Sequence, residues 1–128
     1  MDVPRILNTV IRLCGAGALI LGVACWLGYA PGPAQLRIGL GIALVLFLWA
    51  LAWIAWRRTA RNGLVTFAAV WGLASWVLGL TQHQILPGSL HWVVQVTHLA
   101  VGGLSIALGS LLAAVAVRGV AGTPRLSR

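Results

Sequence analysis

The sequence has 128 residues, of which 60% are hydrophobic and 8% are charged, against about 45–50% and about 25% in ordinary soluble domains. A water-soluble fold could not cover that much apolar surface with nine basic residues and one acidic residue. The composition therefore predicts one integral membrane domain over residues 1–128, in contact with a lipid bilayer. The net charge of +8 does not indicate a nucleic-acid partner, because no basic patch interleaved with aromatic residues is present.

Four long apolar stretches predict an all-α bundle of four transmembrane helices. We expect the helices at about 6–29, 36–56, 63–81 and 90–117. Pro31-Gly32-Pro33 and Pro87-Gly88 predict the two turns on the outer side, since proline does not continue a helix.

The distribution of arginine predicts the orientation in the membrane. Only Arg37 falls among the segments expected on the outer side, whereas all other basic residues lie at the opposite border. These are Arg5, Arg12, Arg57, Arg58, Arg61, Arg118, Arg125 and Arg128. Basic residues accumulate on the cytoplasmic side of membrane proteins. We therefore expect a multi-pass protein of a bacterial-type inner (plasma) membrane, with both termini in the cytoplasm.

An internal repeat predicts that the bundle consists of two tandem helical hairpins. The segment Gly22-Val23-Ala24-Cys25-Trp26 matches Gly72-Leu73-Ala74-Ser75-Trp76 at an offset of 50 residues. Alignment of the second and fourth spans on Arg57 and Arg118, at an offset of 61, pairs Arg37 with His98. The pseudo-repeats cover approximately 6–58 and 62–118, related by a two-fold axis along the membrane normal.

A polar and small-residue stripe on the last span holds the residues most capable of chemistry. Its members, at steps of four and three residues, are His91, Gln95, His98, Gly102, Ser105 and Gly109. Such steps keep side chains on one helical face. An ionisable residue within a span usually faces the bundle interior and is a candidate functional residue.

One interpretation of the stripe is a site for haem b in a small electron-transfer protein. His98 would be an axial ligand, and Gly102, Ser105 and Gly109 would leave room for a flat macrocycle. Arg37 would then pair with a haem propionate. The second axial ligand would be His83, His91, or His98 of a second copy in a homodimer.

Three other interpretations fit the same residues. His83, His91 and His98 could form a zinc or copper site. The stripe could instead line a pocket for a quinone headgroup or another lipid-soluble molecule, with Gln82, His83, Gln84, His91, Gln95 and His98 as its polar groups. In the third, the small residues only allow close helix packing, and the protein is an accessory or scaffolding subunit of a larger membrane complex without a cofactor.

Four short spans with a His-x-x-x-Gly motif, here His98 to Gly102, resemble small membrane b-type cytochromes. That resemblance implies paired histidines on facing helices, and the position paired with His98 here carries Arg37. Hydrolytic and ATP-driven activities are not expected, because the only carboxylate side chain belongs to Asp2 and no catalytic triad or nucleotide-binding motif is present; other enzymatic activity is left open by the sequence.

Two further features of the spans are predicted to be structural. Trp49, Trp53 and Trp56 share one face at the cytoplasmic end of the second span, and we interpret them as an interfacial anchor rather than a cofactor-stacking or lipid-specific site. Cys14 and Cys25 lie in the first span, too far apart along the helix for a disulfide, and we expect them to be small buried packing residues.

Overall fold

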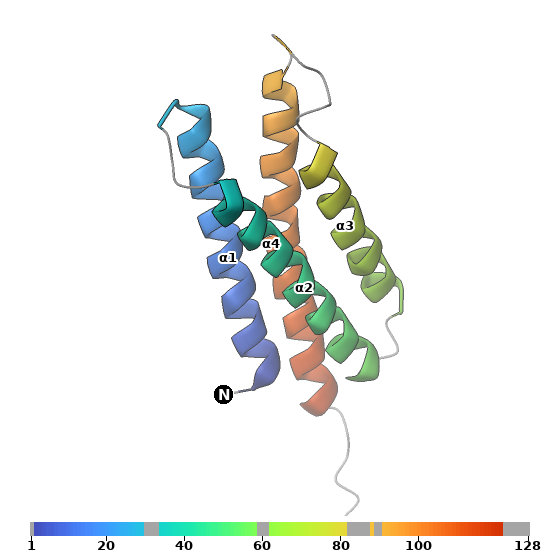
Figure 1. Ribbon diagram of the computed structural model, residues 1–128. Helices are drawn as coiled ribbons and strands as arrows, with labels where there is room; N and C mark the ends of the chain where they lie inside the picture. The colour runs from blue at the N-terminus through green and yellow to red at the C-terminus, as the bar shows by residue number, and fades with distance from the viewer. Residues whose placement is uncertain (1, 30–33, 59–61, 82–87, 89–90, 122–128) are drawn as a thin grey trace, which may run out of the picture.

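The computed structural model describes residues 2–29, 34–58, 62–81, 88 and 91–121. The described chain forms four α-helices, which are α1 (Val3–Trp26), α2 (Ala34–Arg58), α3 (Asn62–Thr81) and α4 (His91–Ala121) (Figure 1). The shortest helix has 20 residues, and about 20 apolar residues cross the hydrocarbon core of a bilayer. All four helices are long and apolar enough to span a membrane, which confirms the predicted fold class.

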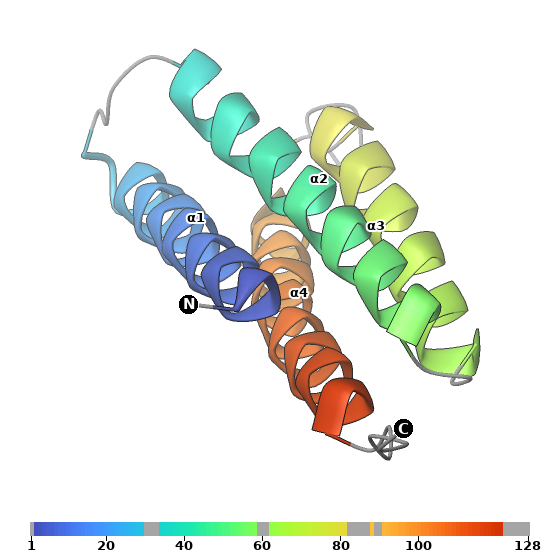
Figure 2. The same ribbon diagram turned by 90° about the horizontal axis from the view of Figure 1, so that it is seen from below.

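The helices form a rhombus rather than a square. Helices α2 and α4 contact each other across the middle, and α1 and α3 each pack against both of them. Within the described residues α1 and α3 do not touch, and Figure 2 shows them on opposite sides of the α2–α4 pair. The central pair therefore carries most of the buried surface.

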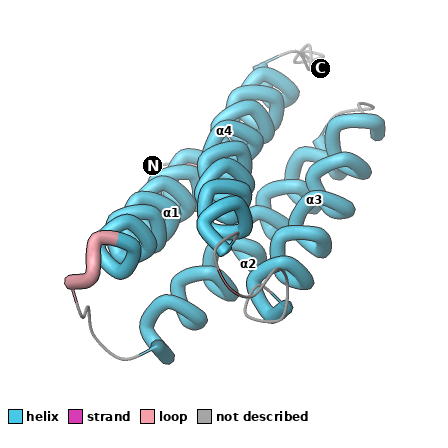
Figure 3. The backbone as a smooth tube through the Cα atoms, turned by 90° about the horizontal axis from the view of Figure 1, so that it is seen from above, coloured by secondary structure: helices cyan, strands magenta, loops and turns pink. Residues whose placement is uncertain are grey.

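We call the two ends of the bundle the basic end and the histidine end. The basic end holds the start of α1, Arg57 and Arg58 at the end of α2, and Arg118 in the last turns of α4. The histidine end holds the ends of α1 and α3 and the starts of α2 and α4, seen from above in Figure 3. The chain alternates between the two ends, as a four-span protein requires.

The hydrophobic core fills the basic half of the bundle. On α2 and α4 its residues recur at steps of three, four and seven, which is one face of each helix. Its members are Ile11, Leu44, Leu48, Leu51, Ala52, Ala55, Ala68, Leu108, Leu112, Ala113 and Ala116. Large apolar side chains such as Leu13, Ile20 and Val70 lie on the outer surface, 61–68% exposed, which fits contact with lipid rather than with water.

The first helix ends three residues before the predicted boundary at Tyr29. Gly28 adopts φ +81°, and the N–H groups of Gly28 and Tyr29 donate to the carbonyl oxygens of Cys25 and Ala24. This pattern is a Schellman motif, which satisfies the last carbonyls of a helix and requires a left-handed residue. Tyr29 therefore lies outside α1.

Candidate functional site

An apolar cavity of about 290 Å³ lies between all four helices in the histidine half of the bundle. Its polar lining side chains are few and come from different helices: Cys25 of α1, Arg37 of α2, Ser75 and Trp76 of α3, and Gln95, His98 and Ser105 of α4. The remaining lining residues are small or aliphatic, apart from Trp26. Few polar groups in an apolar hollow are typical of a site for a small molecule.

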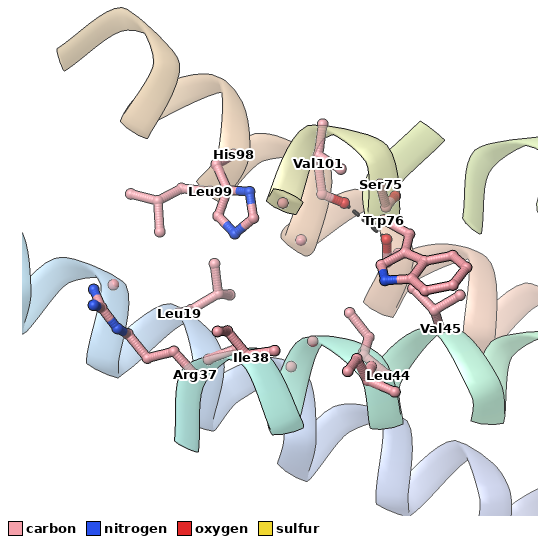
Figure 4. A pocket seen from close by; sticks show the side chains of 18 of the residues that line it. Leu19, Arg37, Ile38, Leu44, Val45, Ser75, Trp76, His98, Leu99 and Val101 are labelled. Carbon is pink, nitrogen blue, oxygen red and sulfur yellow. Dashed lines mark hydrogen bonds between the residues drawn. The ribbon is translucent and has the colours of Figure 1, made fainter. Parts of the chain in front are cut away.

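His98 is the principal polar group of this cavity. Figure 4 shows its ring projecting from α4 toward Leu19 and Ile38, with Arg37 on the far side. The Nδ1 atom is buried and has no hydrogen-bond partner. A buried nitrogen without a partner costs about 1–3 kcal/mol, so Nδ1 of His98 has hydrogen-bonding capacity that a ligand could use.

Packing rather than hydrogen bonding holds the His98 ring. A Cβ atom built on Gly79 of α3 would lie 3.8 Å from Cε1 of His98, so at this position the backbone of α3 faces the ring without a side chain between them. Gly79 thus lies beside the ring on the wall of the cavity.

Among the described residues, Arg37 is the only arginine that lines the cavity. Its guanidinium donates a hydrogen bond of 3.0 Å to Sγ of Cys25. Thiol sulfur is a weak acceptor, and the only acidic side chain of the sequence, Asp2, lies 3.9 Å from Arg5 at the basic end. The guanidinium therefore keeps most of its capacity to bind an oxygen atom of a ligand.

The other predicted residues of the α4 stripe separate into two kinds. Gln95 and Gly102 line the cavity. Ser105 also lines it but is 1% exposed, accepts a 3.2 Å hydrogen bond from Nε1 of Trp71 and donates a 2.9 Å bond to the Val101 carbonyl. Gly109 serves packing, because a Cβ there would lie 2.9 Å from Cγ2 of Ile11.

The side chains of the other two histidines, His83 and His91, are not described by the structure. His83 lies outside the described residues, and His91 begins α4 but its side chain is not described. Among the described residues, no three His, Cys, Asp or Glu side chains gather closely enough to hold a metal ion. The zinc or copper site with three histidines stays a prediction.

The cavity reaches the outer surface of the bundle, because six of its lining residues are exposed there. They are Cys25 and Trp26 of α1, Ile38 and Ile42 of α2, and Trp76 and Leu80 of α3. An opening lined by apolar side chains in the spanning region faces lipid. A molecule dissolved in the bilayer could therefore enter sideways.

Sequence reasoning missed Cys25, Ser75 and Gly79 as cavity residues. Cys25 was expected to be buried, yet it is exposed at the end of α1, where the helix terminates early. Ser75 and Gly79 follow Gly72 at steps of three and four, a small-residue face on α3 like that on α4. That spacing was the signal that could have found them.

Comparison of the chain with protein-family models, with curated proteins and with solved structures found no match in any of the three.

Proposed function

We propose that this protein binds a lipid-soluble molecule with a single-ring, quinone-type headgroup in the cavity at the histidine end. The observation that carries the proposal is the pairing of His98, whose Nδ1 has no partner, with Arg37 on the opposite wall of one apolar cavity. A neutral imidazole offers one donor and one acceptor nitrogen, and a guanidinium offers donors only. Together they match the carbonyl oxygens of a quinone ring.

The size of the cavity favours a single ring. An engineered cavity of about 150 Å³ in another protein accommodates benzene, and the present cavity is about 290 Å³. A substituted six-membered ring fits such a volume, and its isoprenoid or alkyl chain would leave past the exposed apolar residues of the lining. These residues, Trp26, Ile38, Ile42, Trp76 and Leu80, also agree with a lipid-soluble ligand.

Equilibrium binding of a short-chain benzoquinone to the detergent-purified protein tests this proposal. We expect one saturable site and an affinity lowered about tenfold or more in His98→Ala. Thr97→Ala is the matched control, because Thr97 is exposed on the same helix, bonds the Val93 carbonyl and does not line the cavity. Absence of saturable binding, or equal affinity in wild type and His98→Ala, would contradict the proposal.

Haem b is the second candidate, favoured by the unpartnered His98 beside the glycines of the cavity wall and by Arg37 as a partner for a propionate. Among the described residues His98 is the only histidine on that wall. A tetrapyrrole is several times larger than one ring, so the helices would have to separate to admit it. A Soret band in protein from haem-supplemented cells, lost in His98→Ala, would support haem, whereas colourless protein would exclude it.

The proposal includes an orientation in the membrane. The basic end carries Arg5, Arg12, Arg57, Arg58 and Arg118, and the histidine end carries Arg37 alone among the described residues. This asymmetry supports a basic end on the cytoplasmic side of a bacterial-type inner membrane. The quinone site would then lie in the outer half of the bilayer.

A further inference from the structure

A second hollow lies between α2 and α3 at the basic end, outside the cavity just described. Trp49, Ala52, Trp53 and Trp56 form its α2 wall. The α3 wall consists of Asn62, Val65, Thr66, Ala69, Val70 and Leu73. Its volume is about 530 Å³, and it is open on the outer surface, where Trp53, Trp56 and Val70 are 49–61% exposed. We call this hollow the tryptophan groove.

The length of the tryptophan groove matches the depth of one lipid leaflet. Its α3 wall extends from residue 62 to residue 73, which at about 1.5 Å per residue is about 16 Å along the helix. Half of the hydrocarbon core of a bilayer is about 15 Å. The α3 wall is therefore about as long as half of the hydrocarbon core, while the α2 wall, residues 49–56, covers about 10 Å.

Trp49 of α2 joins the two walls of the groove. Nε1 of Trp49 donates a 3.2 Å hydrogen bond to the Ala69 carbonyl, and the same indole packs on Gly72, where a Cβ atom would clash. The polar edge of Trp49 is thus satisfied within the protein. The groove offers a ligand tryptophan ring surface and aliphatic side chains, with Asn62 and Thr66 as the polar residues of its α3 wall.

The rim of the groove is positively charged. The guanidinium carbon of Arg57 lies 4.9 Å from the ring centroid of Trp53. The ring centroids of Trp53 and Trp56 are 5.1 Å apart. A guanidinium stacked on an aromatic ring keeps its N–H edge free for a phosphate. Arg58 follows Arg57 in the last turn of α2, and the one acidic side chain of the sequence lies beside Arg5.

We propose that the tryptophan groove is a specific binding site for an anionic phospholipid of the surrounding bilayer. One acyl chain lies along Trp53, Val70 and Leu73, and the phosphate group is held by Arg57 and Arg58. Trp53 positions Arg57 at the interface. This site is separate from the cavity at the histidine end and does not depend on what that cavity binds.

Quenching of tryptophan fluorescence by brominated lipids tests the proposal. The full-length protein is reconstituted in phosphatidylcholine vesicles that contain increasing amounts of either phosphatidylglycerol or phosphatidylcholine with brominated acyl chains. We expect brominated phosphatidylglycerol to quench at a lower mole fraction. In the double variant R57Q/R58Q this preference should fall by about fivefold or more.

Two controls separate a site from general attraction to the membrane. Arg118→Gln removes an exposed arginine at the same end of the bundle but on α4, and it should keep the preference. Trp53→Phe with Trp56→Phe should remove the phosphatidylglycerol-specific part of the quenching, because those rings border the groove. Equal quenching by the two lipids, or equal loss of preference in R118Q and R57Q/R58Q, would overturn the proposal.

Discussion

The guanidinium of Arg37 on α2 donates a 3.0 Å hydrogen bond to Sγ of Cys25 on α1. The bond joins the first turn of α2 to the last turn of α1 at the edge of the cavity that His98 faces. It directs the charged group of Arg37 toward the cavity wall through a weak acceptor that a ligand oxygen can replace. The guanidinium of Arg37 is therefore held at the cavity wall and can still bind an oxygen atom of a ligand.

Replacement of Arg37 should weaken binding of the quinone headgroup more than replacement of Cys25. Hydrogen bonds from a charged group contribute about 1.5–3 kcal/mol, so Arg37→Gln should lower the affinity for a short-chain benzoquinone about tenfold or more. Cys25→Ala removes only the weak acceptor and should change the affinity by less than about twofold. Equal effects of the two substitutions would show that Arg37 acts only through helix packing.

Trp71 should stabilise the bundle through its hydrogen bond to Ser105, which is 3.2 Å long. Trp71→Phe keeps an aromatic ring but leaves the Ser105 hydroxyl without its donor. We expect a loss of about 0.5–1.5 kcal/mol in the free energy of unfolding, measured by denaturation with sodium dodecyl sulfate in mixed micelles. Trp76→Phe is the control, since Trp76 is 44% exposed, and an equally large loss there would refute the role of the hydrogen bond.

The small residues of α4 should differ in their tolerance to an added methyl group. A Cβ at Gly109 would lie 2.9 Å from Cγ2 of Ile11, which is fully buried and stiff because it is β-branched. Gly109→Ala should therefore destabilise the protein by about 1–3 kcal/mol. A Cβ at Gly103 would meet nothing within 4 Å, and Gly103→Ala should have little effect. The same denaturation assay ranks the two variants.

The orientation predicts the outcome of reporter fusions. A phosphatase active only in the periplasm, fused after Arg128, should be inactive, whereas green fluorescent protein at the same position should fluoresce. The pair of reporters guards against a fusion that simply fails to fold. An active phosphatase with a dark fluorescent protein would place the basic end outside and overturn the arginine-based topology.

Hydropathy was sufficient to predict the four helices within a few residues, because each span is a continuous apolar run bounded by charge or proline. It could not predict the contact between α2 and α4, since helices that are apolar on all sides do not reveal which face is buried. The end of α1 lies three residues before the predicted boundary at Tyr29. The reason is that the Schellman motif at Gly28 depends on backbone conformation rather than on hydrophobicity.

The candidate site was partly visible in the sequence. Placement of Gln95, His98, Gly102 and Ser105 on one face predicted four residues of the cavity wall. The internal repeat, which stays a prediction, paired Arg37 with His98, and both line the same cavity. The partnership of Trp71 with Ser105 was not foreseeable, because it depends on how far α3 is rotated and shifted against α4.

Photoaffinity labelling in membranes with an azido-benzoquinone tests most directly whether the cavity, rather than bulk lipid, holds the ligand. We expect label on cavity-lining residues of α2 and α4, such as Ile38 and Leu99, with competition by unlabelled quinone and loss in His98→Ala. Label spread over outward-facing residues such as Leu13 and Leu111, unaffected by competitor or by His98→Ala, would contradict a quinone site at His98.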